Sequence, residues 1–284
     1  MKPSWLKVKI PSGKNFNKID NLLIQERLHT ICQEALCPNR AECWEKGTAT
    51  FLILGYICTR YCSYCNVKTG KPGKLDLDEP RKIAELVKKL NLKYAVITSV
   101  TRDDLEDGGA DVFYNAVIEI KKSAPGCKVE ILTPEFKNSQ DIQKILNAKP
   151  YVFAHNMEVT ERLFSKIRPQ GNYTLSLKFL EKIKEINKNQ LTKSGIMVGL
   201  GETKEEIIKT MHDLRKVKCD IFTVGQYLQP TKRHAAVQKY YTPTEFKEFE
   251  RIGYSMGFKF VKSGPLVRSS YMAEESLLKN FNCR

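Results

Sequence analysis

Six of the nine cysteines in this 284-residue chain form two groups of three near its start. The first group has the spacing C-x4-C-x5-C and contains Cys32, Cys37 and Cys43. The second group has the spacing C-x3-C-x2-C and contains Cys58, Cys62 and Cys65. Three thiolates can hold three irons of a 4Fe–4S cluster and leave the fourth iron open to another ligand. The spacing therefore favours two iron–sulfur clusters, each with one open corner.

Zinc is the alternative metal for both groups. A structural zinc site needs four protein ligands, and no histidine lies close in sequence to the second group, so a cluster is favoured there. For the first group, a zinc knuckle or buried packing cysteines stay open on the spacing alone. The other three cysteines are isolated, and we expect them to be packing or tail thiols: Cys127, Cys219 and Cys283.

The composition indicates a basic protein that is not built to cross a membrane. Lys and Arg outnumber Asp and Glu by 47 to 32, a net charge of +15 that favours a negatively charged partner. The basic residues are spread along helical stretches such as 81–93 and 178–193, which favours an acidic protein over nucleic acid. No apolar run is long enough to span a bilayer, and residues 1–13 lack the apolar core of a secretory signal, so a cytoplasmic location is expected.

From residue 50 onward, short apolar runs alternate with segments of helical periodicity, which predicts a parallel α/β fold. The six expected strands are 50–54, 94–99, 128–132, 151–154, 195–198 and 221–224. Six such repeats predict a partial TIM barrel of about (β/α)6. We expect one structural unit with an N-terminal extension at 1–48, the barrel at 49–258 and a C-terminal segment at 259–284.

Polar or glycine-rich loops follow five of these expected strands. They are 58–65, 102–109, 155–158, 199–202 and 226–230. The active sites of parallel α/β barrels lie at the carboxyl ends of the strands, so these loops are expected to enclose one pocket. Asp103, Asp104 and Asp107 lie in the second loop but lack EF-hand spacing, which predicts solvated or helix-capping carboxylates.

The second cysteine group, with the aromatic Tyr64 before its last cysteine, resembles the motif of radical S-adenosylmethionine enzymes. The resemblance implies that the methionine part of S-adenosylmethionine chelates the open iron. One electron then cleaves the molecule to a 5′-deoxyadenosyl radical, so the cofactor carries the chemistry and the protein orients it.

Five polar residues of the expected pocket are candidates for binding S-adenosylmethionine. Asn156 and Glu158 could both point into the pocket and bind the ribose hydroxyls. Arg168 could pair with the methionine carboxylate, and Thr98 and Ser99 could bind the methionine amino group. For each of the five, the alternative is an ordinary loop residue or a surface ion pair.

The first cysteine group lies within Cys-Pro-Asn-Arg-Ala-Glu-Cys-Trp at 37–44, and this setting resembles the lipoyl synthase family. The similarity extends from Trp5 to Tyr271 through several further blocks in the same order. The blocks lie at 47–55, 98–109, 155–158, 193–202, 225–230 and 264–271. So many ordered blocks are far more specific than either cysteine group alone.

Membership of that family would imply insertion of two sulfur atoms into an octanoyl chain carried by a protein lysine, with two S-adenosylmethionine molecules consumed. The Cys58–Cys65 cluster would start the radicals, and an auxiliary 4Fe–4S cluster would supply sulfur. The family also implies Ser270 as the fourth ligand of the auxiliary cluster, where a hard alkoxide would bind iron more labilely than a thiolate. The family usually has His after Tyr271, and this chain has Met272.

The implied partners are octanoylated lipoyl carrier domains of the 2-oxoacid dehydrogenase E2 or glycine cleavage H protein type. An electron donor such as ferredoxin or flavodoxin and an iron–sulfur carrier protein are also implied, with no nucleic acid or membrane partner. Another sulfur-inserting or methylthio-transferring radical enzyme is one alternative, which the Arg-Ser-Ser-Tyr block at 268–271 disfavours. A two-cluster electron carrier is the other, and it would need no βα scaffold.

Overall fold

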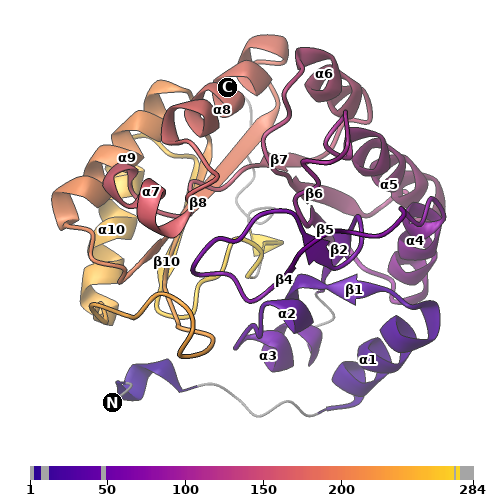
Figure 1. Ribbon diagram of the computed structural model, residues 1–284, viewed down its shortest axis with the longest axis horizontal. Helices are drawn as coiled ribbons and strands as arrows, with labels where there is room; N and C mark the ends of the chain where they lie inside the picture. The colour runs from indigo at the N-terminus through magenta and orange to yellow at the C-terminus, as the bar shows by residue number, and fades with distance from the viewer. Residues whose placement is uncertain (1–2, 8–12, 46–48, 272, 276–284) are drawn as a thin grey trace. The chain divides into compact units, whose positions relative to one another are not determined.

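The computed structural model describes residues 3–7, 13–45, 49–271 and 273–275 (Figure 1). Met272, Cys283 and the start of the 47–55 block lie outside the described residues. The chain divides into two compact units. The N-terminal unit comprises Val8–Arg60 and Asn66–Phe153, and the C-terminal unit comprises Met1–Lys7, Tyr61–Cys65 and Ala154–Arg284.

The N-terminal unit contains a mainly parallel sheet. Its strands are β1 (His29–Thr30), β2 (Thr50–Ile53), β5 (Tyr94–Ser99), β6 (Lys128–Leu132) and most of β7 (Val152–Ala154). Strands β2, β5 and β6 pair in parallel, and the short β1 runs antiparallel to β2. All four residues of β2 are buried, as expected for a parallel strand covered on both faces. A separate parallel pair joins β3 (Ile57–Cys58) to β4 (Lys68–Thr69).

Six helices accompany these strands: α1 (Lys14–Glu26), α2 (Ile31–Glu34), α3 (Arg40–Glu45), α4 (Glu79–Lys89), α5 (Ala110–Ser123) and α6 (Ser139–Asn147). Helices α4, α5 and α6 lie side by side along the unit (Figure 1). Helix α4 buries Ile83, Leu86 and Val87 on one face, which matches the helical spacing of these residues in the sequence.

The C-terminal unit contains three further parallel strands, β8 (Leu191–Val198), β9 (Ile221–Gln226) and β10 (Phe260–Gly264). Its helices are η1 (Ser4–Leu6), η2 (Glu161–Leu163), α7 (Phe164–Ile167), α8 (Tyr173–Ile186), α9 (Lys204–Lys216) and α10 (Pro243–Ser255). Helix α9 begins with a capping box between Thr203 and Glu206, which the Thr-x-x-Glu spacing predicts.

The six strands expected from the sequence are confirmed as β2 and β5 to β9, and so is the α/β class. Strand β10 was not expected. It falls within 259–284, and its residues pair in parallel with β9, with Phe260 opposite Ile221 and Gly264 opposite Gly225. Cys127 and Cys219 are buried core residues, as predicted. Among the helices described, none is long and apolar enough to cross a membrane.

A buried carboxylate, Glu79, holds the turn that leaves β2. Its side chain is 6% exposed and accepts a hydrogen bond from the Leu54 amide at 2.8 Å. Leu54 needs this support because it has a left-handed backbone, with φ of 68°. Burial raises the pKa of Glu79 to about 7, although the backbone hydrogen bond opposes the shift.

We therefore expect Glu79 to make stability pH-dependent. In the unfolded chain its pKa is about 4.3, so the folded protein binds more protons between that value and pH 7. The free energy of unfolding should fall by about 3 kcal/mol as pH rises through this window, because ionised Glu79 is penalised only in the folded state. Urea unfolding of the apoprotein from pH 4.5 to 8 should show this component in the wild type and not in Glu79→Gln. If the free energy of unfolding changed with pH in the same way in both proteins, Glu79 would not be the source of the pH dependence.

Candidate active site

The first cysteine group lies on a short helix–turn–helix in the N-terminal unit. Cys32 is buried on α2, whose N-cap Thr30 accepts the Gln33 amide at 3.3 Å. The Cys37 amide donates to the Cys32 carbonyl at 3.0 Å, and Cys43 follows on α3. All eight cysteines in the described part of the chain are free thiols. The backbone therefore holds the three thiols of this group on one small substructure.

The environment of Cys32 suits a metal-bound thiolate. Burial, together with the neighbouring Cys37, raises the pKa of the Cys32 thiol to about 11, so without a metal it stays protonated at neutral pH. The nearby Thr50 and Trp44 indole act in the opposite direction and favour the thiolate. A cluster iron displaces such a proton, and the donors then have an anion to bind. The donor set fits an iron–sulfur cluster.

Cys58, at the end of β3, also has donors aimed at its sulfur. The backbone amides of Arg60 and Thr101 both donate to Cys58 Sγ at 3.4 Å. The Cys58 carbonyl accepts the Gly70 amide at 3.0 Å, which fixes the chain direction at this residue. Amide donors directed at a cysteine sulfur are a common feature of iron–sulfur sites, so Cys58 fits a cluster ligand.

An ion-pair cluster fixes the segment that contains Cys58. The Arg60 guanidinium donates to both oxygens of Asp103, at 3.1 and 2.9 Å, and to Glu135 at 3.0 Å. The Thr59 hydroxyl donates to Asp103 as well, at 2.8 Å. Although burial opposes ionisation, the hydrogen bonds from Arg60 and Thr59 lower the pKa of Asp103 below its usual range. The Arg60 and Glu135 side chains are 14% and 16% exposed, so water screens this ion pair less than the contact with the more exposed Asp103.

Replacing Arg60 with Met should loosen the Cys58 loop. Losing two charge-assisted contacts is expected to raise the rate at which a chelator removes iron from this site about tenfold. The measurement uses protein in which Cys32, Cys37 and Cys43 are replaced with Ala, so that all bound iron belongs to the cluster at Cys58, Cys62 and Cys65. Arg81→Met is the matched control, because Arg81 also pairs with two carboxylates but is 55% exposed. Equal rates for the two variants would contradict this role.

Cys62 and Cys65 are described with the C-terminal unit, where backbone contacts hold them. The Ser63 amide donates to the Ile167 carbonyl, and the Ala235 amide donates to the Ser63 carbonyl, both at 2.9 Å. His234 Nε2 lies 3.0 Å from the Cys65 carbonyl oxygen, and its Nδ1 lies 2.9 Å from the Thr231 hydroxyl. The loop after β9 therefore positions the end of the cysteine motif. No local pattern in the sequence indicates this role of His234.

Asn156 and Glu158 come together after β7. Asn156 Nδ2 donates to Glu158 Oε1 at 3.1 Å, and Arg168 donates to the Asn156 carbonyl at 3.2 Å. Asn156 Oδ1 is buried with no hydrogen-bond partner among the described residues. Glu158 has a left-handed backbone, with φ of 68°, which side chains other than glycine adopt mainly where the surroundings impose it. Asn156 Oδ1 and the Glu158 carboxylate are acceptors that lie side by side, so they suit a ligand with two neighbouring hydroxyl groups.

The charge on Glu158 depends on its neighbours. Burial raises the pKa of Glu158, while Arg168 and the Asn156 hydrogen bond oppose the shift. Burial likewise raises the pKa of Tyr64 well above its usual value, and the charge of Glu158 adds to this shift. Tyr64, the aromatic residue of the cysteine motif, is therefore electrostatically coupled to the Asn156–Glu158 pair.

Thr98 and Ser99 end β5 and differ in their hydroxyl groups. The Thr98 hydroxyl donates to the Leu132 carbonyl at 3.0 Å, so it supports the sheet. The Ser99 hydroxyl is buried and has no hydrogen-bond partner among the residues described. Of the two, Ser99 is the one with hydrogen-bonding capacity left for a ligand.

Ser270 lies in a tight turn after β10. The Val267 amide donates to the Gly264 carbonyl at 3.1 Å, and the Tyr271 amide donates to the Arg268 carbonyl at 2.7 Å. Ser270 is half-buried in this turn, next to Ser269, whose hydroxyl is buried without a partner in the described residues. Ser270 belongs to the C-terminal unit and the first cysteine group to the N-terminal unit, and its ligand role stays a prediction.

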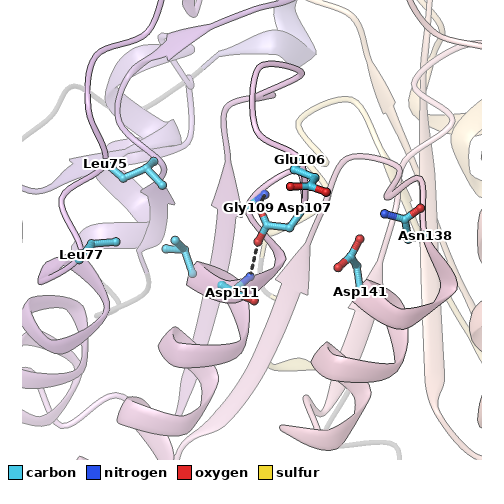
Figure 2. Close-up of a pocket in the computed structure, with 9 residues that line it drawn as sticks. Leu75, Leu77, Glu106, Asp107, Gly109, Asp111, Asn138 and Asp141 are labelled. Atoms are coloured by element: carbon cyan, nitrogen blue, oxygen red, sulfur yellow. Dashed lines mark hydrogen bonds between the residues drawn. The ribbon is translucent and has the colours of Figure 1, made fainter.

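A cavity of about 440 Å³ lies in the N-terminal unit beside the first turns of α5 and α6 (Figure 2). It is lined by Leu75, Leu77, Glu106, Asp107, Gly109, Asp111, Val112, Asn138 and Asp141. The Asp107 carboxylate accepts the amides of Gly109 and Asp111, each at 2.9 Å, so Asp107 caps α5 as predicted. In the described ranges, no three His, Cys, Asp or Glu side chains are grouped closely enough to hold a single metal ion.

Comparison with known proteins identifies the family. The Radical SAM superfamily profile matches residues 52–214, and a profile for the N-terminal domain of lipoyl synthase matches residues 1–37. A lipoyl synthase from Rubrobacter xylanophilus is 51% identical over 96% of this chain and 86% of its own length. Lipoyl synthases from Caldicellulosiruptor bescii and Caldanaerobacter subterraneus are each 52% identical over 97% of this chain, and over 95% and 97% of their own lengths. The chain belongs to the lipoyl synthase family.

Solved structures of lower identity show the same fold. Methylornithine synthase aligns with a TM-score of 0.57 at 15% identity, over 94% of this chain and 88% of its own. The FeFe-hydrogenase maturase HydG from Carboxydothermus hydrogenoformans aligns with a TM-score of 0.61 at 15% identity, over 94% and 62%. The predicted partial TIM barrel is confirmed. As a radical SAM lipoyl synthase family member, the chain uses 4Fe–4S clusters and S-adenosylmethionine as cofactors.

Proposed function

We propose that this member of the lipoyl synthase family is a sulfurtransferase that inserts two sulfur atoms into an octanoyl chain attached to a carrier-protein lysine. One observation carries the proposal. Two groups of three free cysteines occur in a chain that is about half identical to lipoyl synthases along nearly its full length. Each group has hydrogen-bond donors directed at one of its sulfurs, Cys32 in the first and Cys58 in the second. A two-cluster electron carrier, the alternative function, would need these clusters but would not need ligand-binding groups such as Asn156 and Glu158.

Cys58, Cys62 and Cys65 of the second group would hold the radical-generating cluster, which with bound S-adenosylmethionine would supply the one-electron chemistry that removes hydrogen from an unactivated C–H bond. The protein's task is to orient that cofactor and exclude water. Asn156 Oδ1, which has no partner among the described residues, and the Glu158 carboxylate beside it accept the two ribose hydroxyls. Ser99 binds the methionine amino group, with Thr98 holding the strand end beside it. Arg168 orients Asn156 and pairs with the methionine carboxylate.

Cys32, Cys37, Cys43 and Ser270 hold the auxiliary cluster, which supplies sulfur when it is bound. Ser270 provides the most labile link, because a hard alkoxide leaves iron more readily than a thiolate does. In this proposal, the extension at 1–48, the barrel at 49–258 and the segment at 259–284 act as one functional unit. The auxiliary cluster would have to hold its sulfide within reach of the substrate carbon, because sulfur insertion depends on proximity of the reacting atoms.

The proposed partners are octanoylated lipoyl domains of the E2 or H protein type, a ferredoxin or flavodoxin that donates electrons, and an iron–sulfur carrier protein that rebuilds the auxiliary cluster. The proposed location is the cytoplasm. The net charge of +15 favours docking of an acidic carrier domain, and raised salt should weaken that docking. An affinity for the carrier that does not change with ionic strength would contradict this part of the proposal.

Anaerobic reconstitution followed by product analysis tests the proposed function. The wild type should bind about eight irons and form lipoyl product on an octanoylated carrier peptide. Ser270→Ala should form no product while keeping the cluster at Cys58, Cys62 and Cys65. Ser269→Ala is the matched control and should stay active, since that hydroxyl is one position away on the same turn. About four irons in the wild type, or equal activity of the two variants, would refute the ligand assignment.

A further inference from the structure

Trp44 is a buried side chain whose polar atom has no evident structural function. It is 0% exposed, and its indole Nε1 meets no hydrogen-bond acceptor at normal geometry within the described residues. Leaving a buried N–H without a partner costs about 1–3 kcal/mol, so native proteins rarely do so without a reason. The indole N–H nevertheless interacts with the sulfur of Cys32, whose thiolate form it favours.

Trp44 is held rigidly in this position. Its ring packs on Phe16 with 5.0 Å between ring centroids, and the Arg40 guanidinium lies 5.4 Å from the centroid of each ring. Helix α3 places Trp44 directly after Cys43, so the backbone that positions a cysteine also positions the indole. These two contacts and complete burial leave the N–H few alternative directions.

The register of β1 against β2 brings a second donor residue to the same sulfur. Thr30 pairs with Phe51, so the chain that continues to Cys32 runs beside Thr50. Thr50 is 3% exposed, and its amide and hydroxyl both interact with the Cys32 thiol. Trp44 and Thr50 therefore both favour the thiolate form of Cys32.

We propose that Trp44 donates its indole N–H to the auxiliary cluster at the Cys32 corner and, with Thr50, makes this the corner that stays bound while sulfur is removed. The inference rests on the proposed function, because it requires a cluster at Cys32, Cys37 and Cys43. Hydrogen bonds to a cluster's sulfurs stabilise its more negative, reduced state and raise its reduction potential. Trp44 would thus position and electronically tune the cluster at Cys32, while Ser270 would supply the more labile ligand.

The direct test detects the indole nitrogen from the cluster itself. Trp5→Phe leaves Trp44 as the remaining one of two tryptophans, and Cys58, Cys62 and Cys65→Ala leaves the auxiliary cluster alone. With ¹⁵N-indole label, pulsed EPR of the reduced cluster should show a ¹⁵N hyperfine coupling. Iron bound without that coupling would overturn the donor role and leave the proposed function standing. Failure of this protein to bind a cluster would instead overturn the assignment of the first cysteine group.

A second measurement separates hydrogen bonding from packing. Trp44→Phe keeps an aromatic ring but removes the N–H, whereas Phe16→Leu disturbs the packing and keeps the donor. Trp44→Phe should make reduction of the auxiliary cluster about tenfold less favourable, which lowers its potential by about 59 mV for one electron. Phe16→Leu should leave the potential unchanged. Equal shifts in the two variants, or none in Trp44→Phe, would show that Trp44 acts only by packing.

Discussion

Gly225→Ala is expected to lower the rate of lipoyl formation about a hundredfold without altering any ligand. A Cβ at Gly225 would lie 1.9 Å from the carbonyl oxygen of Val267 and 2.8 Å from its carbon. Both are backbone atoms that cannot rotate away, so the turn between Gly264 and Tyr271 must move. That turn carries Ser270, and a displacement of about 1 Å in a reacting group can cost a factor of 100 in rate.

The measurement compares product formation and iron content of reconstituted Gly225→Ala with Gly126→Ala. Gly126 is a suitable control because a Cβ there would meet nothing within 4 Å. We expect Gly225→Ala to keep the Cys58–Cys65 cluster and a folded circular dichroism spectrum, and to lose auxiliary-cluster function. If Gly225→Ala made product at the control rate, Ser270 would not depend on the position of this turn.

Asp220→Asn is expected to have the largest effect on stability, a loss of about 3–5 kcal/mol in the free energy of unfolding. Asp220 and Lys184 form an ion pair in the C-terminal unit, with side chains that are 6% and 8% exposed. The Asp220 carboxylate also accepts the Thr192 amide at 2.9 Å and the Lys259 ammonium at 3.0 Å. Without the carboxylate, the Lys184 charge stays buried with only carbonyl groups, such as that of Gln190, to solvate it.

Urea unfolding of the apoprotein measures this effect. Glu185→Gln is the matched control, because its ion pair with Lys182 is exposed and worth little. Adding Lys184→Met to Asp220→Asn should recover part of the lost stability, since the unpaired charge is then removed. A loss in Asp220→Asn no larger than in Glu185→Gln would show that the buried pair contributes nothing.

Much of the fold could be predicted because its signals are local. The parallel strands are runs of apolar residues such as Tyr94–Ser99, and Thr203 and Glu206 show a capping box in the sequence itself. Strand β10 was missed because it is short and ends in Lys-Ser-Gly, with three of its five residues only half-buried. What makes it a strand is pairing with β9, which no local pattern records.

The site was predictable where chemistry depends on spacing along the chain, as in the two cysteine groups. It was not predictable where the partner is distant in sequence. Arg60 meets Asp103 and Glu135, 43 and 75 residues further on, and His234 meets Cys65 across 169 residues. Arg60 and His234 look like ordinary loop residues in the sequence. Trp44 stands beside Cys43 in the chain, but its interaction with Cys32 follows from the packing of α3 on Phe16.

The central claim is that the cluster at Cys32, Cys37, Cys43 and Ser270 is the source of both inserted sulfur atoms. The most direct measurement assembles the clusters with ³⁴S-sulfide, removes free sulfide, and analyses the product of a single turnover on an octanoylated carrier peptide by mass spectrometry. We predict a lipoyl group with two ³⁴S atoms, formed by the wild type and not by protein with Cys32, Cys37 and Cys43→Ala. A product that contains unlabelled sulfur, or that still forms in the cysteine variant, would contradict the account.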